Sequence, residues 1–161
     1  MVPSRVFWVL VGAQFLALSC SSNQVGLPAA TGITQNLTRN AGTTLYWVDE
    51  IGGIGNPYGS KSIRVSAVGE FTARGWAVDK QSQTPAGGVD IVLDNIPYGA
   101  SYGLDRLDVA DGQKVAAYRQ SGWQFSMPAS RLKGTHALTV RIVSNDRKSY
   151  YEIPTLTLSV E

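Results

Sequence analysis

The chain has 161 residues, enough for one domain with a single hydrophobic core once any targeting segment is set aside. Its 14 Lys and Arg residues are nearly balanced by 12 Asp and Glu and are scattered, which excludes the basic face of a nucleic-acid-binding protein. A hydrophobic content of 43% excludes a disordered chain, and 17 glycines favour the many turns of an all-β protein.

The N-terminus has the architecture of an export signal. Arg5 precedes an apolar run over residues 6–18, which is short for a membrane-spanning helix and normal for a signal-peptide core. The small residues Ala17 and Ser19 stand three and one positions before Cys20, which is the only cysteine. Small residues at these positions are what signal peptidase requires, so we expect a signal peptide over residues 1–19.

The run Leu16-Ala17-Leu18-Ser19-Cys20 resembles a bacterial lipobox, in which the cysteine becomes the first mature residue and is acylated on its thiol and amino group. Several acyl chains hold a protein firmly at a bilayer and account for a lone cysteine. Ala17 stands where a branched aliphatic residue is usual, so secretory cleavage with a free exported thiol stays an alternative, as does an uncleaved anchor.

Ser21 after the cysteine resembles the pattern of lipoproteins sent to the outer membrane of bacteria with two membranes, and implies a location facing the periplasm. Residues 20–42 are rich in Ser, Asn, Gly, Thr and Ala and have no sustained hydrophobic period. We interpret them as the lipidated Cys20 and a flexible tether, so the folded domain is expected over residues 43–161.

After residue 43, alternation of apolar and polar residues predicts a series of half-buried strands. Residues 71–78 are apolar on both faces and are expected to form a central strand. Asn145-Asp146 lies between two good strands and predicts a hairpin, and only residues 111–119 have the spacing of a short helix. The expected strands include residues 63–65, 71–78, 89–93, 123–127, 136–143 and 151–160.

Seven or eight short strands with frequent turns predict an antiparallel two-sheet β-sandwich of the Ig-like kind. Because the domain contains no cysteine, it has no buried disulfide of the antibody type, and Trp76 or Trp123 is the expected core aromatic residue.

Several short motifs carry a resemblance to a known kind of domain. The most distinctive are GWAVD at residues 75–79 and RLDVA at residues 106–110, and further pieces lie at 88–94, 121–123 and 134–136. Together they resemble small Ig-like β-sandwich domains of bacterial envelope proteins, including ones appended to large membrane proteins that handle glycans. The likeness covers most of residues 44–160 and implies an accessory or binding role at the cell envelope, with no catalytic residue.

Candidate catalytic and metal-binding residues are few. His136 is the only histidine and no GxSxG motif occurs, so a structural or surface role is favoured over catalysis. Asp105, Asp108 and Asp111 recur at three-residue intervals and offer oxygen ligands for Ca²⁺, but the spacing is not that of an EF-hand and Arg106 is placed to neutralise one of them. We therefore expect neither a metal nor a cofactor.

Asp79 and Arg106 lie inside the two distinctive motifs, and we expect them to form a buried or semi-buried structural ion pair that joins a strand end to the following loop. A catalytic pair such as Asp49 with Asp79 would suit glycoside hydrolysis, but the domain is small for a glycan-cleaving cleft, so no enzymatic activity is expected. The residues expected to carry the structural motif are Trp76, Asp79, Arg106, Asp108 and Trp123.

Tyr58, Tyr98 and Tyr102 lie in Gly- and Pro-bearing stretches that we expect to be loops, where tyrosine offers contact surface for sugars or proteins or covers the end of the core. The expected function is non-catalytic binding of an envelope protein or glycan through these residues. Two alternatives are a structural or assembly subunit that pairs through a strand edge and, least favoured, an enzyme acting on envelope glycan.

Overall fold

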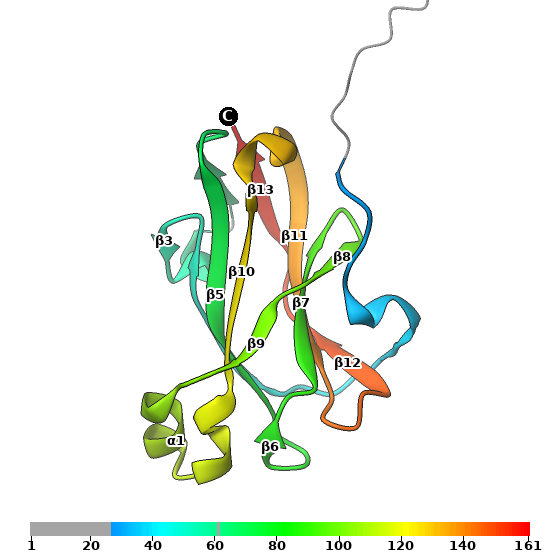
Figure 1. Ribbon diagram of the computed structural model, residues 1–161, viewed down its shortest axis with the longest axis vertical. Helices are drawn as coiled ribbons and strands as arrows, with labels where there is room; N and C mark the ends of the chain where they lie inside the picture. Colours follow the sequence, from blue (N-terminus) through cyan, green and yellow to red (C-terminus); the bar gives the residue numbers. More distant parts are fainter. Residues whose placement is uncertain (1–26, 61) are drawn as a thin grey trace, which may run out of the picture.

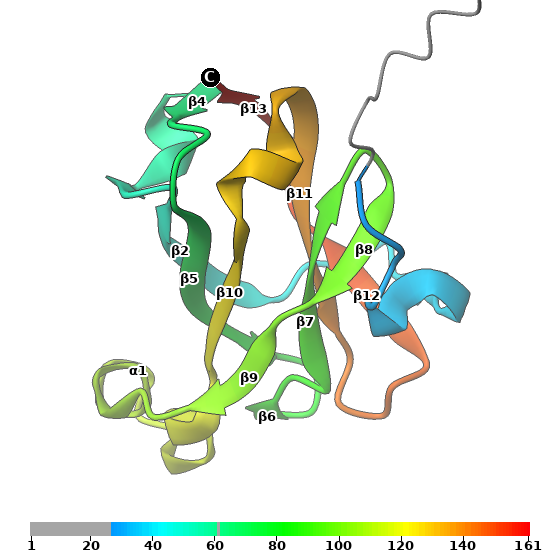
Figure 2. The same cartoon turned by 45° about the horizontal axis from the view of Figure 1, so that its top comes forward.

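Two sheets pack face to face in the computed structural model, which describes residues 27–60 and 62–161 (Figures 1 and 2). The predicted all-β sandwich is thereby confirmed. The expected signal peptide and Cys20 lie outside the described residues. Within these ranges, no helix is long and apolar enough to cross a membrane.

The seven-stranded sheet is organised around β11 (Gly134–Val143). One edge of β11 pairs with β7 (Gly88–Leu93), and the other pairs first with β13 (Leu156–Val160) and then with β12 (Ser149–Glu152). The hairpin predicted at Asn145-Asp146 is confirmed, because it joins the antiparallel neighbours β11 and β12. The remaining strands of this sheet are β1 (Thr38–Arg39), β4 (Ser62–Val65) and β8 (Ile96–Gly99).

The six-stranded sheet is organised around β5 (Glu70–Asp79). β5 lies between β2 (Leu45–Ile51) and β10 (Gly122–Pro128), which confirms the predicted central strand. The other strands are β3 (Ile54–Gly55), β6 (Thr84–Pro85) and β9 (Ser101–Leu104). Short helical segments connect the strands: η1 (Ile33–Asn36), η2 (Pro57–Gly59), α1 (Leu107–Gln113), η3 (Ala116–Gln120) and η4 (Ala129–Leu132).

The main core lies between the sheets, where the predicted inward rows meet. Trp123 is the largest fully buried side chain, so it is the core aromatic residue. Trp76 is half-buried on the opposite, outer face of the six-stranded sheet, and there it packs against a second small cluster of Val78, Val109 and Tyr118. Leu138, Val140 and Ile142 of β11 are buried together, as their alternation predicts.

Two element boundaries differ from expectation. Residues 151–160 form parts of two strands, because Pro154, which has no N–H to donate to a ladder, lies between β12 and β13. The helix expected over residues 111–119 is instead the pair α1 and η3, which are separated by Lys114 in the left-handed conformation with φ of 56°.

Residues 27–42, which the composition assigned to the tether, include a segment docked on the sandwich. We call residues 27–39 the arm. Leu27 packs against the main core, the Tyr98 hydroxyl donates to the Pro28 carbonyl at 2.7 Å, and β1 adds to β12 as a parallel strand. The domain therefore makes ordered contacts well before residue 43, and the polar composition of the arm concealed them.

One buried carboxylate holds the middle of the arm. Asp90 is 1% exposed in β7, and its Oδ2 accepts hydrogen bonds from the Thr34 N–H at 2.8 Å and the Thr34 hydroxyl at 2.7 Å. Gly32 passes so close that a Cβ there would lie 2.5 Å from the same oxygen. A buried carboxylate needs hydrogen-bond donors, and the arm supplies two of them to Oδ2, whereas Oδ1 has no partner among the described residues. We call the two hydrogen bonds from Thr34 to Asp90 the clamp.

We predict that Thr34→Val destabilises the domain by about 1–3 kcal/mol, because a nearly isosteric side chain leaves Asp90 with one donor fewer. The matched control is Thr43→Val at an exposed position, where the change should be within about 0.5 kcal/mol. Urea unfolding measures both free energies. Equal effects of the two substitutions would show that the clamp does not stabilise the fold.

Candidate functional site

The expectation that Tyr98 and Tyr102 lie in loops and offer contact surface does not hold, because both belong to strands. Tyr98 is 2% exposed in β8. The Tyr102 hydroxyl in β9 donates to the Ala77 carbonyl and accepts from the Ala86 N–H, both at 2.7 Å. Both hydroxyls are thus engaged by the backbone of neighbouring segments, and these tyrosines serve the packing of the sandwich.

The expected ion pair between Asp79 and Arg106 is also wrong. Asp79 is buried and accepts hydrogen bonds from the backbone N–H of Asn145 at 2.9 Å and of Gln81 at 3.1 Å. It therefore joins the end of β5 to the β11–β12 hairpin through neutral donors. A carboxylate supplied with backbone donors needs no arginine to be accommodated in the interior.

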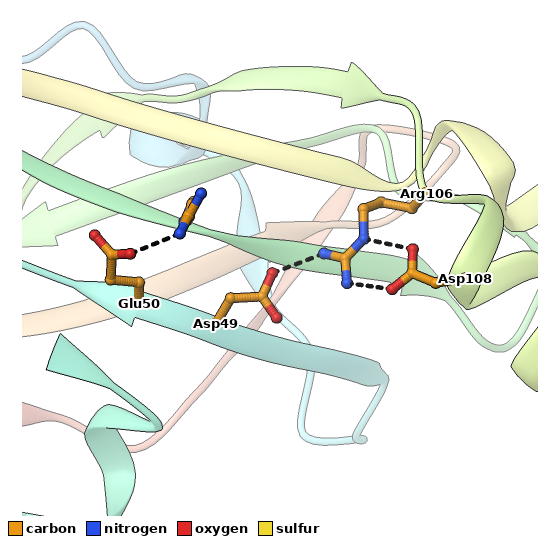
Figure 3. Close-up of polar contacts among 5 residues, drawn as sticks. Asp49, Glu50, Arg106 and Asp108 are labelled. Carbon is orange, nitrogen blue, oxygen red and sulfur yellow. Dashed lines mark hydrogen bonds and ion pairs between the residues drawn. The ribbon is translucent and has the colours of Figure 1, made fainter. Parts of the chain in front are cut away.

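Arg106 instead lies across the outer face of the six-stranded sheet (Figure 3). Its Nε and Nη2 form a bidentate pair with the two oxygens of Asp108, at 2.9 and 2.7 Å, and its Nη1 donates to Asp49 at 2.7 Å. The side chain passes over Gly122, where a Cβ would meet Arg106 Cγ at 3.0 Å. One guanidinium thus links α1 to β2, across a position that has no side chain.

This geometry leaves a hollow of about 420 Å³, which we call the Arg106 hollow. Its polar groups are carboxylates, guanidinium groups and the exposed amide of Gln124. Pockets of about 300–1,000 Å³ are the usual size for small-molecule ligands. The side chains that line it include Asp49, Arg74, Leu104, Asp105, Arg106 and Gln124.

An apolar row runs beside the hollow. The register pairs Trp47 with Trp76, Trp76 with Gly122, and Gly122 with Leu104, so these positions cross the sheet on its outer face. Trp47 is 50% exposed and Leu104 is 43% exposed. Alternation along β2 is the sequence signal that would have placed Trp47 on the outer face, because its neighbour Val48 is buried. Alternation along β10 likewise places Gln124 on the outer face, because its neighbour Trp123 is buried.

The three aspartates considered for Ca²⁺ do not converge on an ion. Asp105 pairs with Arg119, and Asp108 pairs with Arg106. Within residues 27–60 and 62–161, no group of three or more His, Cys, Asp or Glu side chains is arranged to hold a metal. Arg106 lowers the pKa of Asp108, chiefly through the hydrogen bonds to its carboxylate and despite partial desolvation.

A second, smaller hollow of about 210 Å³ lies at the edge of β2 and is lined by Tyr46, Trp47, Val48, Asn56 and Tyr58. Consecutive residues of one strand alternate between its two faces, so a cavity lined by three of them lies along the strand edge. β3 pairs with β2 only at Glu50 and Ile51. The Tyr58 hydroxyl is buried there and has no hydrogen-bond partner among the described residues.

His136 is engaged on both ring nitrogens. Its Nδ1 lies 2.6 Å from Asp94 Oδ2, and its Nε2 lies 3.0 Å from the Leu132 carbonyl. Although desolvation opposes it, hydrogen bonds from His136 and the Ala137 N–H hold the pKa of Asp94 below its usual value. The cluster ties the β7–β8 turn to η4 and leaves neither nitrogen free for proton transfer, in keeping with the structural role favoured for His136.

The comparisons with known proteins add little. No family model and no curated protein matches the sequence. Among solved structures, domains 4 and 5 of the S-layer protein SbsC are similar, with a TM-score of 0.34 and 13% identity over 72% of this chain and 53% of that chain. This chain therefore spans about half the length of that structure. A similarity this distant supports no functional argument, and the fold assignment depends on the sheet topology above.

We predict that Arg106→Lys destabilises the domain by about 1–2 kcal/mol, because an ammonium group cannot replace a bidentate pair and a third hydrogen bond at once. The control is Arg74→Lys, since Arg74 pairs with Glu50 while its side chain is 62% exposed. There the loss should stay below about 0.5 kcal/mol. Denaturant unfolding of both variants checks the difference, and a larger loss in Arg74→Lys would contradict this view of the site.

We predict that Asp94→Asn destabilises the domain at neutral pH and that this deficit shrinks on acidification. A carboxyl whose folded pKa is lowered contributes fully above its unfolded value of about 3.9, and this contribution is lost as pH falls through the folded value. Unfolding free energies of both proteins at pH 7 and at pH 3 test this. A deficit that is unchanged or larger at pH 3 would contradict the prediction.

Proposed function

We propose that this chain is an exported, lipid-anchored envelope protein whose sandwich binds a neutral glycan in the Arg106 hollow without catalysing a reaction. The anchoring part is supported by the signal architecture around Cys20, and the envelope setting by the resemblance of the GWAVD and RLDVA motifs. The binding part rests on one observation. A hollow with both hydrogen-bond donors and acceptors lies beside an apolar row that contains the exposed Trp47.

The charge balance of the hollow favours an uncharged ligand. Four carboxylates and three guanidinium groups lie in or beside it, and they are joined in ion pairs, so the site offers no surplus of positive charge. An anionic ligand would meet net repulsion. Sugar hydroxyls donate to carboxylates and accept from guanidinium and amide groups, so they match this mixed lining. The seven groups are Asp49, Glu50, Asp105, Asp108, Arg74, Arg106 and Arg119.

The apolar row supplies the second half of a sugar site. Trp47 offers a large, rigid and half-exposed surface at one end of the row, and Leu104 offers a smaller one at the other end, beyond Gly122. Aromatic rings bury large apolar areas at small entropic cost, which suits the C–H faces of sugar rings. The hollow would then bind hydroxyl groups while the row contacts the ring faces.

The acids of the hollow are poorly suited to glycoside hydrolysis. A general acid needs a raised pKa, which apolar surroundings provide, and Arg106 has the opposite effect on the pKa of Asp108. Asp49 accepts from the same guanidinium, and Asp105 accepts from Arg119. These pairs favour a binding role over the glycan-acting enzyme considered from the sequence.

The test titrates the chain from Ser21 onward with neutral N-acetylglucosamine oligosaccharides and with anionic hyaluronan fragments of equal length. The neutral series should raise the thermal midpoint and change tryptophan fluorescence, and the anionic series should bind at least tenfold more weakly. Trp47→Ala and Gln124→Ala should each weaken binding about tenfold or more. Gln113→Ala, at an exposed site on α1, should leave the affinity unchanged.

Absence of binding by neutral glycans, or equal binding of both series, would overturn this function. A second candidate would then take its place, namely an assembly subunit that pairs with another envelope protein through a strand edge. The observation favouring it is the stretch Leu45–Val48 of β2, which contains no protective Lys or Pro and lies beyond the pairing with β3. A photoreactive residue at Tyr46 that crosslinks a partner in native membranes would support this alternative.

A further inference from the structure

We infer that the docked arm fixes the pose of the sandwich on the bilayer, with the Arg106 hollow facing away from the lipid. This inference rests on the proposed acylation of Cys20 and concerns how the binding site is presented. Its premise is that the arm belongs to the folded domain. The anchoring tether is therefore much shorter than the composition of residues 20–42 suggests.

The described chain enters the domain at one end, which we call the anchor end. In Figures 1 and 2, the start of the described chain (blue) lies beside the β7–β8 turn, at the same end of the sandwich as η4 and the C-terminus. At this end the β4–β5 loop is joined to η4 by the hydrogen bond from Ala129 N–H to the Gly69 carbonyl at 2.9 Å, and to the C-terminal residue by that from Ala67 N–H to the Glu161 carbonyl at 2.7 Å. The loop at this end carries Val68, which is 86% exposed.

The Arg106 hollow lies toward the opposite end. β10 runs from Gly122, which forms part of the hollow, to Pro128 beside η4 at the anchor end. α1, η3 and β6 gather at the far end in both views, and Arg106 directly precedes α1. The hollow is on the outer face of the six-stranded sheet, whereas the arm runs along β8 of the seven-stranded sheet.

Hydrogen bonds hold the arm to the sandwich along its length. The N–H groups of Thr31 and Gly32 both donate to the Pro97 carbonyl, at 3.1 and 2.9 Å, before Thr34 reaches the buried Asp90. Beyond η1, β1 pairs with β12, and Asn40 N–H donates to the Tyr150 carbonyl at 2.7 Å. The arm is held at its start, middle and end.

The number of residues between Cys20 and the arm limits how the sandwich can be oriented on the bilayer. From Cys20 to Leu27 there are seven Cα–Cα steps, which span at most about 25 Å when fully extended. The ten residues of β5 alone, with nine such steps, span about 30 Å. With the arm docked, Leu27 therefore stays within about 25 Å of the bilayer. A sandwich standing on its far end would hold Leu27 about 30 Å away, beyond the reach of the tether, so the anchor end faces the bilayer. A free tether over residues 21–42 would span up to about 75 Å and permit any orientation.

The experiment uses the full-length acylated protein in liposomes of phosphatidylethanolamine and phosphatidylglycerol that contain a headgroup energy acceptor. Acylated Cys20 has no free thiol, so Val68→Cys and Gly112→Cys each give one site for a maleimide donor. Val68 is exposed at the anchor end, and a side chain at Gly112 on α1 meets nothing within 4 Å. We expect several-fold higher energy transfer from position 68 than from position 112.

Two further variants test the cause. A flexible insertion of about 20 Gly and Ser residues after residue 26 keeps the arm docked but lengthens the tether, and should bring the two transfer efficiencies together. Thr34→Val weakens the clamp and should reduce the difference between the labels. Equal transfer from both labels in the acylated protein without the insertion would overturn the inferred pose while leaving glycan binding untouched. Mass spectrometry that finds no acyl chain on Cys20 would overturn both the pose and the proposed anchoring.

Discussion

The buried carboxylate of Asp90 is the constraint that determines where the folded domain begins in the chain. β7 is buried along its whole length, so a carboxylate within it must find donors in the interior. Those donors belong to Thr34, which lies 56 residues earlier in the chain. A single polar residue in an apolar strand therefore recruits the arm to the sandwich. The place where the chain enters the fold, and with it the inferred pose on the membrane, depends on that recruitment.

On the more exposed outer face of the six-stranded sheet, a single charged residue again joins distant segments of the chain. Gly122 removes a side chain from the row between Trp76 and Leu104, and Arg106 occupies the space above it. The guanidinium joins α1 to β2, so the polar lining is held in place by interactions within the protein. A site whose groups are already oriented loses less conformational entropy when a ligand arrives. The same pairs also keep the charge of the hollow close to balance.

The strands that bury one face were predictable because alternation reports burial directly, as in β10 and β11. The hairpin at Asn145-Asp146 and the central position of β5 followed from equally local signals. The arm was not predictable, because β1 has only two residues and its partner β12 lies more than a hundred positions away. The local pair of Arg106 with Asp108 was predictable, because the two residues are only two positions apart. Its second partner, Asp49, is 57 residues distant, and the sequence motifs suggested Asp79 in its place. Tyr98 and Tyr102 were misplaced because their neighbouring Gly and Pro residues imitate a loop.

The pairing of β1 with β12 also has a consequence for the order of folding. The arm is the first part of the described domain to be synthesised, yet β7, β8 and β12, on which it docks, follow much later. Contacts of such long sequence separation form only after the intervening chain has been ordered. The arm therefore stays undocked and accessible until the sandwich has closed. A protease that acts on the incompletely folded chain would meet the arm as a free peptide, whereas the folded protein presents the arm as part of its surface.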